Sequence, residues 1–492
     1  MSELAAFARP RVVVIGGGIA GLTAALDLAE HLPTDLGGHP GGADIIVLEG
    51  ADRLGGKLRL DEVAGHLVDV GAESMLAVRP EALDLVDAIG AADRVTVPAT
   101  TSASVWSRGA LHPLPRATLM GIPADAESAR GILDDAELHR LRDERPWPGG
   151  PLTEDVSVGD YVAARLGDAV VDRLVEPLLG GVYAGHARRL SLRATMPAVW
   201  DLATRGQSLI SRPVAALPSR PPFAGLLGGV GSLPGLVVDH LRDRGVTMRT
   251  GSLVRGLERT AHGWRLVIGS AAAPEYLEAD AVVLALPPAP AARLLTPHAA
   301  EAAALLAGIE TASSAVVTFA IPRATLGDLP GSGFLVPPVE GRRIKASTFS
   351  SNKWAWTADL APDLFFLRAS FGRAREEADL QRPDDELVEI ALAEVSTALD
   401  RPLPTPVDAH VQRWGGGLPQ YAVGHVDRVA AIHTDVGGLP GLELCGAAYD
   451  GVGIPAVIAT GRRASHSTRQ YLARRGAQLT PATHETRGAI SR

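Results

Sequence analysis

The stretch RVVVIGGGIAGLTAALDLAEHL, residues 11–32, decides the fold of this chain. A short β-branched run, residues 11–15, leads through a cluster of glycines into apolar residues with helical spacing. A Gly/Pro-rich loop, residues 33–43, then separates this helix from a second apolar strand, residues 44–48. The order strand–helix–strand predicts a parallel sheet with a right-handed crossover connection.

Three glycines between the first strand and the helix form the pattern G-x-G-x-x-G. Gly16 permits a tight turn, Gly18 lets a pyrophosphate approach the backbone, and Gly21 lets helix and strand pack closely. The N-terminal turn of the helix, with Ile19 and Ala20, offers free N–H groups to the phosphates. The pattern alone also fits an ordinary strand-to-helix turn, so further elements are needed.

Two such elements follow. Glu49 ends the second strand, where a carboxylate accepts hydrogen bonds from the ribose hydroxyls of a dinucleotide. The segment ADRLGGKL brings a second glycine pair close to the cofactor and indicates a flavoprotein rather than an NAD enzyme, and HLVDVGAES adds a tight turn after a strand. The candidate FAD contacts in these segments are Arg53, Gly56, Lys57, Leu58, Gly71, Ala72, Glu73 and Ser74.

Composition sets further limits. The chain has 492 residues and a formal net charge of −9, which argues against nucleic acid as the main partner. The cationic residues are nearly all arginine, since Lys57, Lys345 and Lys353 are the only lysines. The single cysteine, Cys445, and the absence of a secretory signal pattern or an apolar run of spanning length favour a cytoplasmic protein. Peripheral membrane contact is left open, and no metal site is predicted.

The pattern of elements predicts an α/β fold in which a Rossmann-like FAD-binding domain is interleaved with other parts. A helix after Gly228–Gly231, a β-meander beginning at VTMRT (residues 246–250) and the strand AVVLALP are expected in its second segment. The expected division is an FAD-binding domain at 1–90, 221–290 and 416–475, a mainly helical subdomain facing the substrate or a membrane at 91–220, a mixed-sheet substrate domain at 291–415, and a flexible tail at 476–492.

In these nucleotide-binding segments, the sequence resembles the amine-oxidase-like FAD superfamily. Within it, the chain is most similar to the protoporphyrinogen/coproporphyrinogen oxidases of haem biosynthesis. The resemblance is carried by LLGGVYAGHARRLSLRATMP (178–197), RWGGGLPQYAVGH (413–425) and GAAYDGVGIPAVIATGRRAS (446–465). Within these stretches, Gly180–Gly185 and Trp414–His425 are the more specific blocks. Together with shorter blocks, they span nearly the whole chain in the family order.

The resemblance implies further site residues. The expected FAD contacts are Val254, Trp414, Gly446, Val452, Gly453 and Ile454. For Val254 and Ile454, ordinary core packing is the alternative. Arg79 would pair with a propionate, Gly185 would face the pyrrole N–H groups, and Phe349 would form an apolar wall. As alternatives, Arg79 is a surface arginine before Pro80 and Phe349 is plain core. Further contacts with substrate carboxylates could come from Arg59, Lys345, Arg368 and Arg373.

The resemblance also implies a reaction. It is the oxygen-dependent oxidation of coproporphyrinogen III to coproporphyrin III by hydride transfer to FAD, with hydrogen peroxide as by-product and hand-over of the product to a ferrochelatase left open. The alternatives are protoporphyrinogen IX as substrate, an amine oxidase or desaturase, and a binding module that has lost its flavin. No catalytic base is assigned, although Tyr183, His186, Tyr421 and His425 qualify by residue type.

Overall fold

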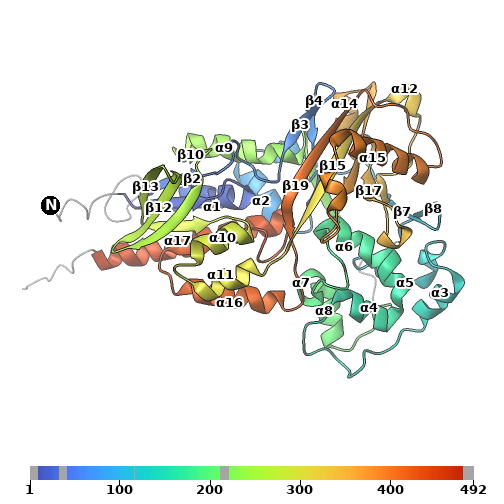
Figure 1. The fold of residues 1–492 in the computed structure, drawn as a ribbon, viewed down its shortest axis with the longest axis horizontal. Coiled ribbons are helices and arrows are strands. Elements are labelled where there is room, and N and C mark those ends of the chain that lie inside the picture. Colours follow the sequence, from blue (N-terminus) through green and yellow to red (C-terminus); the bar gives the residue numbers. More distant parts are fainter. Residues whose placement is uncertain (1–8, 33–41, 116, 211–220, 480–492) are drawn as a thin grey trace, which may run out of the picture.

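A five-stranded parallel sheet forms one half of the molecule (Figure 1). In this computed structural model, residues 9–32, 42–115, 117–210 and 221–479 are described. The sheet order is β10-β2-β1-β14-β20, so strands from the beginning, middle and end of the sequence lie side by side, and the predicted interleaving is confirmed. These strands are β1 (Arg11–Ile15), β2 (Asp44–Leu48), β10 (Thr247–Arg249), β14 (Ala281–Leu284) and β20 (Leu442–Leu444).

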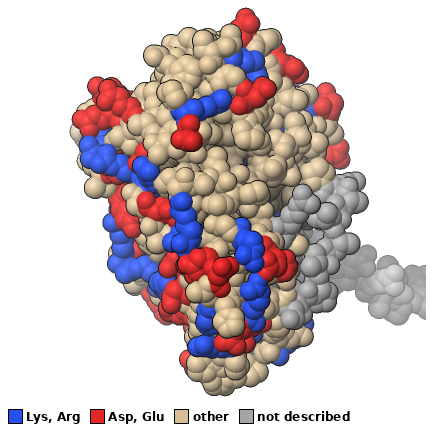
Figure 2. All heavy atoms as spheres, turned by 90° about the vertical axis from the view of Figure 1, so that its right-hand side faces the viewer, with Lys and Arg blue, Asp and Glu red and all other residues tan. Residues whose placement is uncertain are grey.

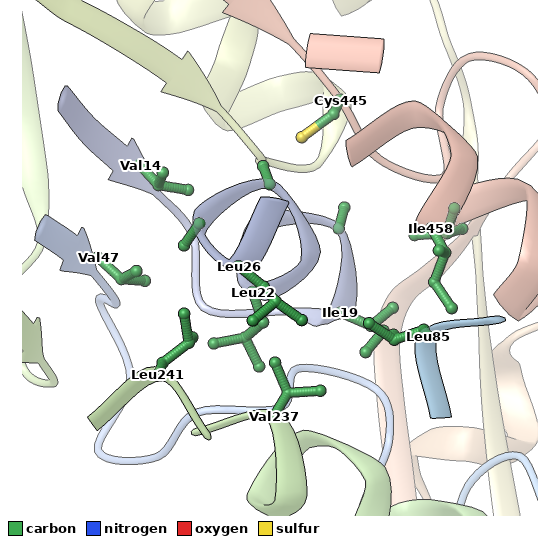
Figure 3. Close-up of a cluster of buried hydrophobic side chains, with 14 of the residues drawn as sticks. Val14, Ile19, Leu22, Leu26, Val47, Leu85, Val237, Leu241, Cys445 and Ile458 are labelled. Atoms are coloured by element: carbon green, nitrogen blue, oxygen red, sulfur yellow. The ribbon is translucent and has the colours of Figure 1, made fainter. Parts of the chain in front are cut away.

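One face of this sheet is covered by helices that share an apolar core. Figure 3 shows Val14 of β1 and Val47 of β2 on the side of Leu22 and Leu26, which lie on the central helix α1. Burying a leucine side chain stabilises the fold by about 1.5–3 kcal/mol, so this packing fixes the first helix against the sheet. The helices are α1 (Ile19–His31), α2 (Glu81–Ala88), α9 (Leu233–Asp243) and α17 (Ile454–Leu479).

The opposite face is covered by an antiparallel three-stranded sheet and three helices. Residues 247–249 were expected in this β-meander, but β10 pairs in parallel with β2 instead. Helix α9, which packs against α1, precedes β10 and brings the chain to the edge of the parallel sheet beside β2. The elements here are β11 (Val254–Thr260), β12 (Gly263–Ser270), β13 (Ala273–Ala279), α10 (Pro288–Leu295), α11 (Ala300–Ala307) and α16 (His425–Gly437).

The other half of the molecule holds a seven-stranded mixed sheet in the order β19-β15-β18-β17-β16-β7-β8. Helix α15 (Asp384–Ala398) packs on one face through Leu387, Ala391 and Val395. The strands are β7 (Ser104–Ser107), β8 (Ala110–Pro113), β15 (Thr311–Pro322), β16 (Gly333–Leu335), β17 (Ile344–Thr348), β18 (Leu364–Phe371) and β19 (Asp408–Pro419), and the nearby helices are α12 (Arg323–Leu326), α13 (Ser350–Lys353) and α14 (Ala355–Leu360).

A mainly helical region lies below this sheet in Figure 1 and has a core of its own. Its helices are α3 (Asp135–Arg142), α4 (Val158–Leu166), α5 (Asp168–Val170), α6 (Glu176–Tyr183), α7 (Leu192–Thr195) and α8 (Pro197–Thr204). Short strands connect the parts: β3 (Leu60–Val63) pairs with β4 (His66–Asp69), and β9 (Phe223–Leu226) pairs with β5 (Met75–Leu76) and β6 (Val95–Thr96).

The positions of two expected boundaries differ from the structure. The substrate domain was expected to begin at residue 291. Helices α10 and α11 pack in the core beside the parallel sheet, and the first strand after residue 291 to join the large sheet is β15, which begins at Thr311. Helix α17 continues to Leu479, beyond the expected start of a tail at residue 476. Residues 480–492 and the loop 33–41 lie outside the described residues. The division into domains otherwise stays a prediction.

Figure 2 shows the surface of the end of the molecule that holds the seven-stranded sheet and the helical region. Acidic and basic side chains lie next to one another over the lower part of this face and in smaller groups near its top and left edges, with uncharged surface between them. This mixture agrees with the many exposed arginine–carboxylate pairs, such as Arg130–Glu127 and Arg188–Asp168. In the part of the chain that the structure describes, no helix combines the length and apolar character required to cross a membrane.

Candidate active site

A cavity of about 750 Å³ connects the two halves of the molecule. It begins where β1, β2 and β14 end, at the carboxyl edge of the parallel sheet, which is where open α/β sheets bind ligands. Its far wall comes from the large sheet, through residues of β15, β17, β18 and β19 such as Val316, Lys345 and Arg368. The volume lies in the range of about 300–1,000 Å³ that is common for small-molecule sites.

The three glycines of the first loop have different surroundings. Gly16 has φ +112°, and a Cβ there would lie 2.3 Å from the carbonyl oxygen of Ala285. A Cβ on Gly21 would lie 2.0 Å from the carbonyl oxygen of Gly16. A Cβ on Gly18 would meet no atom within 4 Å, and Gly18 lines the cavity. The first and third glycines thus permit close packing, whereas the second keeps space free for a ligand.

The second glycine loop packs directly against the first. The N–H of Gly55 donates to the carbonyl of Gly17 over 2.8 Å, and a Cβ on Gly56 would lie 3.1 Å from the Cα of Gly18. Arg53 holds this loop from outside the cavity, since its guanidinium donates to the carbonyl oxygen of Gly56 over 2.6 Å. Two glycine loops therefore form one wall at the N-terminus of α1, where no side chain caps the helix.

Glu49 lies at the end of β2 and lines the same cavity. One carboxylate oxygen accepts a hydrogen bond from the N–H of Gly17 (2.7 Å), and the other accepts one from Ala51 (2.8 Å). These two backbone donors fix the carboxylate next to the glycine loop. Because each carboxylate oxygen can accept more than one hydrogen bond, Glu49 can still bind ligand hydroxyl groups.

The C-terminal segment forms the next part of the wall. Gly446, Val452, Gly453 and Ile454 line the cavity, and α17 begins at Ile454 with Pro455 in its first turn. The N-terminus of a helix carries free N–H groups and the positive end of its dipole, so negative charge on a ligand is stabilised there. Trp414 of β19 lines the same cavity, and a Cβ on Gly71 would lie 3.1 Å from its ring.

The turn at residues 71–74 is joined to the large sheet by an ion-pair network around Glu73. The carboxylate binds the Nζ of Lys353 over 2.8 Å and the guanidinium of Arg368 over 2.9 Å, and it accepts a further bond from the Ser350 hydroxyl. Burial alone would raise the pKa of Glu73, but these two cations outweigh it and lower the pKa to about 2. Glu73 is therefore ionised at any working pH.

Two further lysines line the cavity without a carboxylate partner among the described residues. Loss of solvent around Lys57 lowers its pKa to about 8. Burial, reinforced by repulsion from Arg373, lowers the pKa of Lys345 to about 7. The Lys345 Nζ donates to the carbonyl oxygen of Gly372 over 3.0 Å.

The residues that qualified as a base by type have structural roles. The Tyr421 hydroxyl donates to the carbonyl of Ala447 (2.6 Å) and accepts from the N–H of Gly451 (2.9 Å), so it holds the C-terminal turn in place. His425 stacks on Tyr421, and burial lowers the pKa of His425 to about 4. Tyr183, His186, Tyr421 and His425 are all missing from the described residues that line the cavity.

Most of the predicted FAD contacts are brought together in this cavity, and several other candidates are not. Val254 is buried in the core beside the parallel sheet, and Arg79 is partly exposed and paired with Glu81. Phe349 packs between Phe334 and Phe365 in the core of the large sheet. The predicted residues on the cavity wall are Gly16, Gly18, Ile19, Ala20, Glu49, Gly56, Lys57, Leu58, Gly71, Ala72, Glu73, Ser74, Trp414, Gly446, Val452, Gly453 and Ile454, whereas Gly21, Arg53, Arg79, Gly185, Val254 and Phe349 lie outside it.

Sequence reasoning missed the segment Ala285–Pro288 and most of the wall supplied by the large sheet. The sequence did indicate the place of Ala285–Pro288, because this segment follows β14 and the carboxyl ends of parallel strands meet at one edge of the sheet. Ser314, Thr348 and Ser370 had no such signal, since alternation in a strand does not tell which face borders a cavity.

Comparison with known proteins identifies the family. The sequence profile of the flavin-containing amine oxidoreductases matches residues 19–467. The chain belongs to this family. It is 39% identical over 473 residues to the coproporphyrinogen III oxidase of Mycobacterium tuberculosis (strain ATCC 25618 / H37Rv), with 93% of this chain and 97% of the relative covered. The coproporphyrinogen III oxidase of Bacillus subtilis is 28% identical, with 94% and 99% covered.

A solved structure agrees with this result. The putative protoporphyrinogen oxidase from Exiguobacterium sp. 255-15 superimposes with a TM-score of 0.81 at 30% identity, covering 94% of this chain and 99% of that one. The family uses flavin, and the open space at Gly18, the fixed Glu49 carboxylate and the α17 N-terminus fit an FAD molecule. The chain is thus an FAD-dependent oxidoreductase.

Proposed function

We propose that this protein oxidises coproporphyrinogen III to coproporphyrin III, with O2 as the electron acceptor and hydrogen peroxide as by-product. One observation supports this most. The cavity joins the cradle for FAD to a wall of the large sheet that carries both small or apolar residues and cations, such as Val316, Ala369 and Lys345. A flat apolar macrocycle with carboxylate side chains needs that combination.

The chain orients its substrate and supports the charge changes of the reaction. FAD, when bound, supplies the acceptor for hydride and the route of electrons to O2. The free N–H groups at the start of α17 stabilise negative charge at the wall formed by Gly453 and Ile454. Trp414 and the turn at residues 71–74 confine the ligand between the two halves of the molecule. No side chain is assigned as the base, because the pyrrole proton can leave to water.

Protoporphyrinogen IX is the second candidate substrate. Coproporphyrinogen has more carboxylate groups than protoporphyrinogen, so it gains more from cations at the site. Lys57 and Lys345 line the cavity without a carboxylate partner among the described residues. The other charged groups are engaged, since Glu73 pairs with Arg368 and Glu49 accepts from backbone donors. This excess of available positive charge favours the substrate with more carboxylates.

The proposed substrate contacts differ in how directly the structure supports them. Arg79 follows the cavity-lining turn closely in sequence, but it has to leave Glu81 before it can bind a propionate. A Cβ on Gly185 would lie 2.2 Å from Oε1 of Gln420, so a larger residue there would displace the Gln420 side chain. Phe349 would act from below the sheet surface, because it is 1% exposed. Contact of Val254 with the adenine region is proposed from its place near Glu49, whose carbonyl accepts the N–H of Ser252.

Two partners outside the chain are proposed as well. A porphyrin product is reactive and poorly soluble, so direct hand-over to a ferrochelatase would protect it. Peripheral contact with a membrane surface would help to collect an apolar substrate. Both can be examined by co-purification and by sedimentation with vesicles.

A direct assay tests the proposed reaction. Purified, FAD-loaded protein is mixed with coproporphyrinogen III in air, and porphyrin fluorescence is followed together with peroxide. We expect fluorescence and peroxide to appear in air and to stop under argon. Peroxide from amines without porphyrin formation would favour the amine-oxidase alternative, and a purified protein without flavin absorbance would favour a binding module.

A further inference from the structure

Lysine is rare in this chain and is concentrated at the cavity. The sequence has 47 lysines and arginines, of which three are lysine. Lys57 and Lys345 line the cavity, and Lys353 binds Glu73, which also lines it. Lysine differs from arginine in being a compact point charge that tolerates burial by a shift of its pKa. The three lysines therefore indicate positions at or near the cavity that require a compact cation. Arginine, although common elsewhere in this chain, does not meet this requirement.

Lys345 is the most unusual of the three. The register between β17 and β18 shifts between Ile344 and Ala346, so Lys345 is the extra residue of a β-bulge. In a regular strand, neighbouring side chains point to opposite faces of the sheet, and a bulge interrupts this alternation. Here Lys345 and its neighbour Ala346 both line the cavity. Lys345 is 7% exposed. The bulge thus places a buried amine at the cavity wall.

The hydrogen bonds of this amine are incomplete. A protonated lysine has three N–H donors, and the hydrogen bond found for the Lys345 Nζ goes to the neutral carbonyl of Gly372. No carboxylate pairs with Lys345 among the described residues. A buried charge without a counter-charge is costly, so an additional partner would stabilise it.

A second buried cation lies next to it. Arg373 is 6% exposed, its guanidinium donates to the carbonyl of Val336 over 3.2 Å, and burial lowers its pKa. Repulsion from Arg373 contributes to the lowered pKa of Lys345, because the two charges are close. Within the described part of the chain, Arg373 also has no ion-pair partner within salt-bridge distance. Lys345 therefore lies at the cavity wall, and the second cation, Arg373, lies outside the cavity lining. Attraction from Glu376, Glu176 and Glu394 opposes the lowering of the pKa of Arg373 by burial.

We propose that Lys345, with Arg373 behind it, forms a binding subsite for a carboxylate group of the substrate. The inference rests on the proposed function, since a porphyrinogen carries such groups on its rim. A carboxylate at the Lys345 Nζ would take up its unused donors and would be attracted by both cations. The role is one of binding and orientation, and the electron transfer itself does not require it.

The test compares three variants of the FAD-loaded enzyme with the wild type. Lys345→Met removes the charge, Lys345→Arg keeps it, and Arg265→Gln removes an exposed cation from β12, remote from the cavity lining. Binding of coproporphyrin III and of its tetramethyl ester is measured by fluorescence quenching, and kcat and KM are measured with coproporphyrinogen III. The ester has the same macrocycle without charge, so it isolates the contribution of the carboxylates.

We expect Lys345→Met to weaken binding of the free acid about tenfold or more and to leave binding of the ester unchanged, as a lost charge-assisted hydrogen bond requires. KM should rise by a similar factor while kcat stays within about twofold. Lys345→Arg should retain most of the preference for the acid, and Arg265→Gln should behave like the wild type. If Lys345→Met fails to load FAD, Lys345→Gln replaces it in the same comparison.

Besides an unchanged affinity of Lys345→Met for the free acid, two results would overturn the subsite. One is equal loss of acid and ester binding, and the other is a fall in kcat with unchanged KM and affinity, which would make Lys345 a proton-transfer group instead. A wild-type enzyme that oxidises no porphyrinogen contradicts the proposed function. A wild-type enzyme that does so, with a Lys345→Met variant of unchanged affinity, contradicts only the subsite.

Discussion

Glu73 and Arg368 form an ion pair of 2.9 Å between the turn beside the glycine loops and strand β18 of the large sheet. Both side chains are nearly buried, at 9% and 11% exposure. The guanidinium of Arg368 also donates to the carbonyl of Gly71 in the same turn. This pair, together with Lys353, fastens the wall of the FAD cradle to the wall that faces the substrate.

The first prediction concerns this pair. Glu73→Gln leaves Lys353 and Arg368 buried without their counter-charge, so we expect a loss of about 3 kcal/mol in stability and reduced FAD content. A thermal melt and the flavin absorbance of the purified protein measure both. Glu275→Gln is the matched control, because Glu275 is exposed, its partner Arg249 is partly exposed, and the loss there should be below about 1 kcal/mol. Equal melting temperatures for the two variants would contradict the role of Glu73.

The pH dependence of this contribution follows from the lowered pKa. Since the pKa of Glu73 is about 2 in the folded protein and 4.5 in an ordinary carboxyl group, its stabilisation is complete above about pH 4.5. It is lost as the pH falls through 2. The difference in melting temperature between wild type and Glu73→Gln should therefore be constant from pH 5 to 8 and shrink below about 4.5.

The second prediction concerns the first glycine loop. Gly18→Val places a side chain in the open space of the cavity, so the protein should fold but bind little FAD. Gly21→Val should unfold or strongly destabilise the protein, because its Cβ would overlap the carbonyl of Gly16. Gly235→Val on α9, where a Cβ meets no atom within 4 Å, is the control for the substitution itself. Circular dichroism and flavin content separate the three outcomes, and normal flavin content in Gly18→Val would argue against the cradle.

The third prediction concerns Lys345 in the substrate-free protein. Its pKa falls from 10.5 to about 7, so between these values the unfolded chain binds more protons and stability rises with pH. Below pH 7 the folded state carries the full cost of the buried charge. Lys345→Met should therefore melt a few degrees higher than the wild type at pH 6, and this gain should disappear near pH 10. A gain that is independent of pH would contradict the buried ammonium.

The fourth prediction concerns the attachment of the cofactor. Cys445 is fully buried, burial raises the pKa of its thiol to about 12, and it is absent from the described residues that line the cavity. FAD should therefore be bound without a covalent bond. After denaturation with acid and centrifugation, the flavin should remain in the supernatant. Flavin that stays with the precipitated chain would contradict this expectation.

The fifth prediction concerns Arg79. If it binds a propionate, Arg79→Ala should raise KM for the porphyrinogen severalfold while FAD content stays normal. Glu81→Gln, which frees Arg79 from its present partner, should have the opposite or no effect on KM. Steady-state kinetics on both variants decide the matter, and unchanged KM in Arg79→Ala would remove this residue from the substrate site.

The sequence was sufficient for the parts of the fold that depend on local pattern. Gly16 and Gly21 predicted the strand–turn–helix because close packing at both points, and a positive φ at Gly16, tolerate only glycine. Gly18 predicted the open space beside this turn. Glu49 was predictable because the end of a parallel strand next to this turn has a fixed place. The resemblance to a known family added Trp414 and the turn at Val452–Ile454, which no periodicity indicates.

Other features depend on contacts between distant segments and had no local signal. Strand β10 pairs with β2 in the parallel sheet, although its residues fit a meander equally well. The pairing of Glu73 with Arg368 joins residues far apart in sequence, and arginines are too frequent here for one to stand out. The bulge at Lys345 arises from the register of two paired strands, and a single strand does not reveal it.

The most direct test of the central claim is a side-by-side measurement of kcat/KM for coproporphyrinogen III and protoporphyrinogen IX with the same FAD-loaded preparation. We expect both to be oxidised in air, with coproporphyrinogen III favoured by about tenfold or more because additional carboxylates meet the cations of the cavity. Equal values or a preference for protoporphyrinogen IX would contradict the proposed substrate. No oxidation of either one would contradict the assignment as a porphyrinogen oxidase.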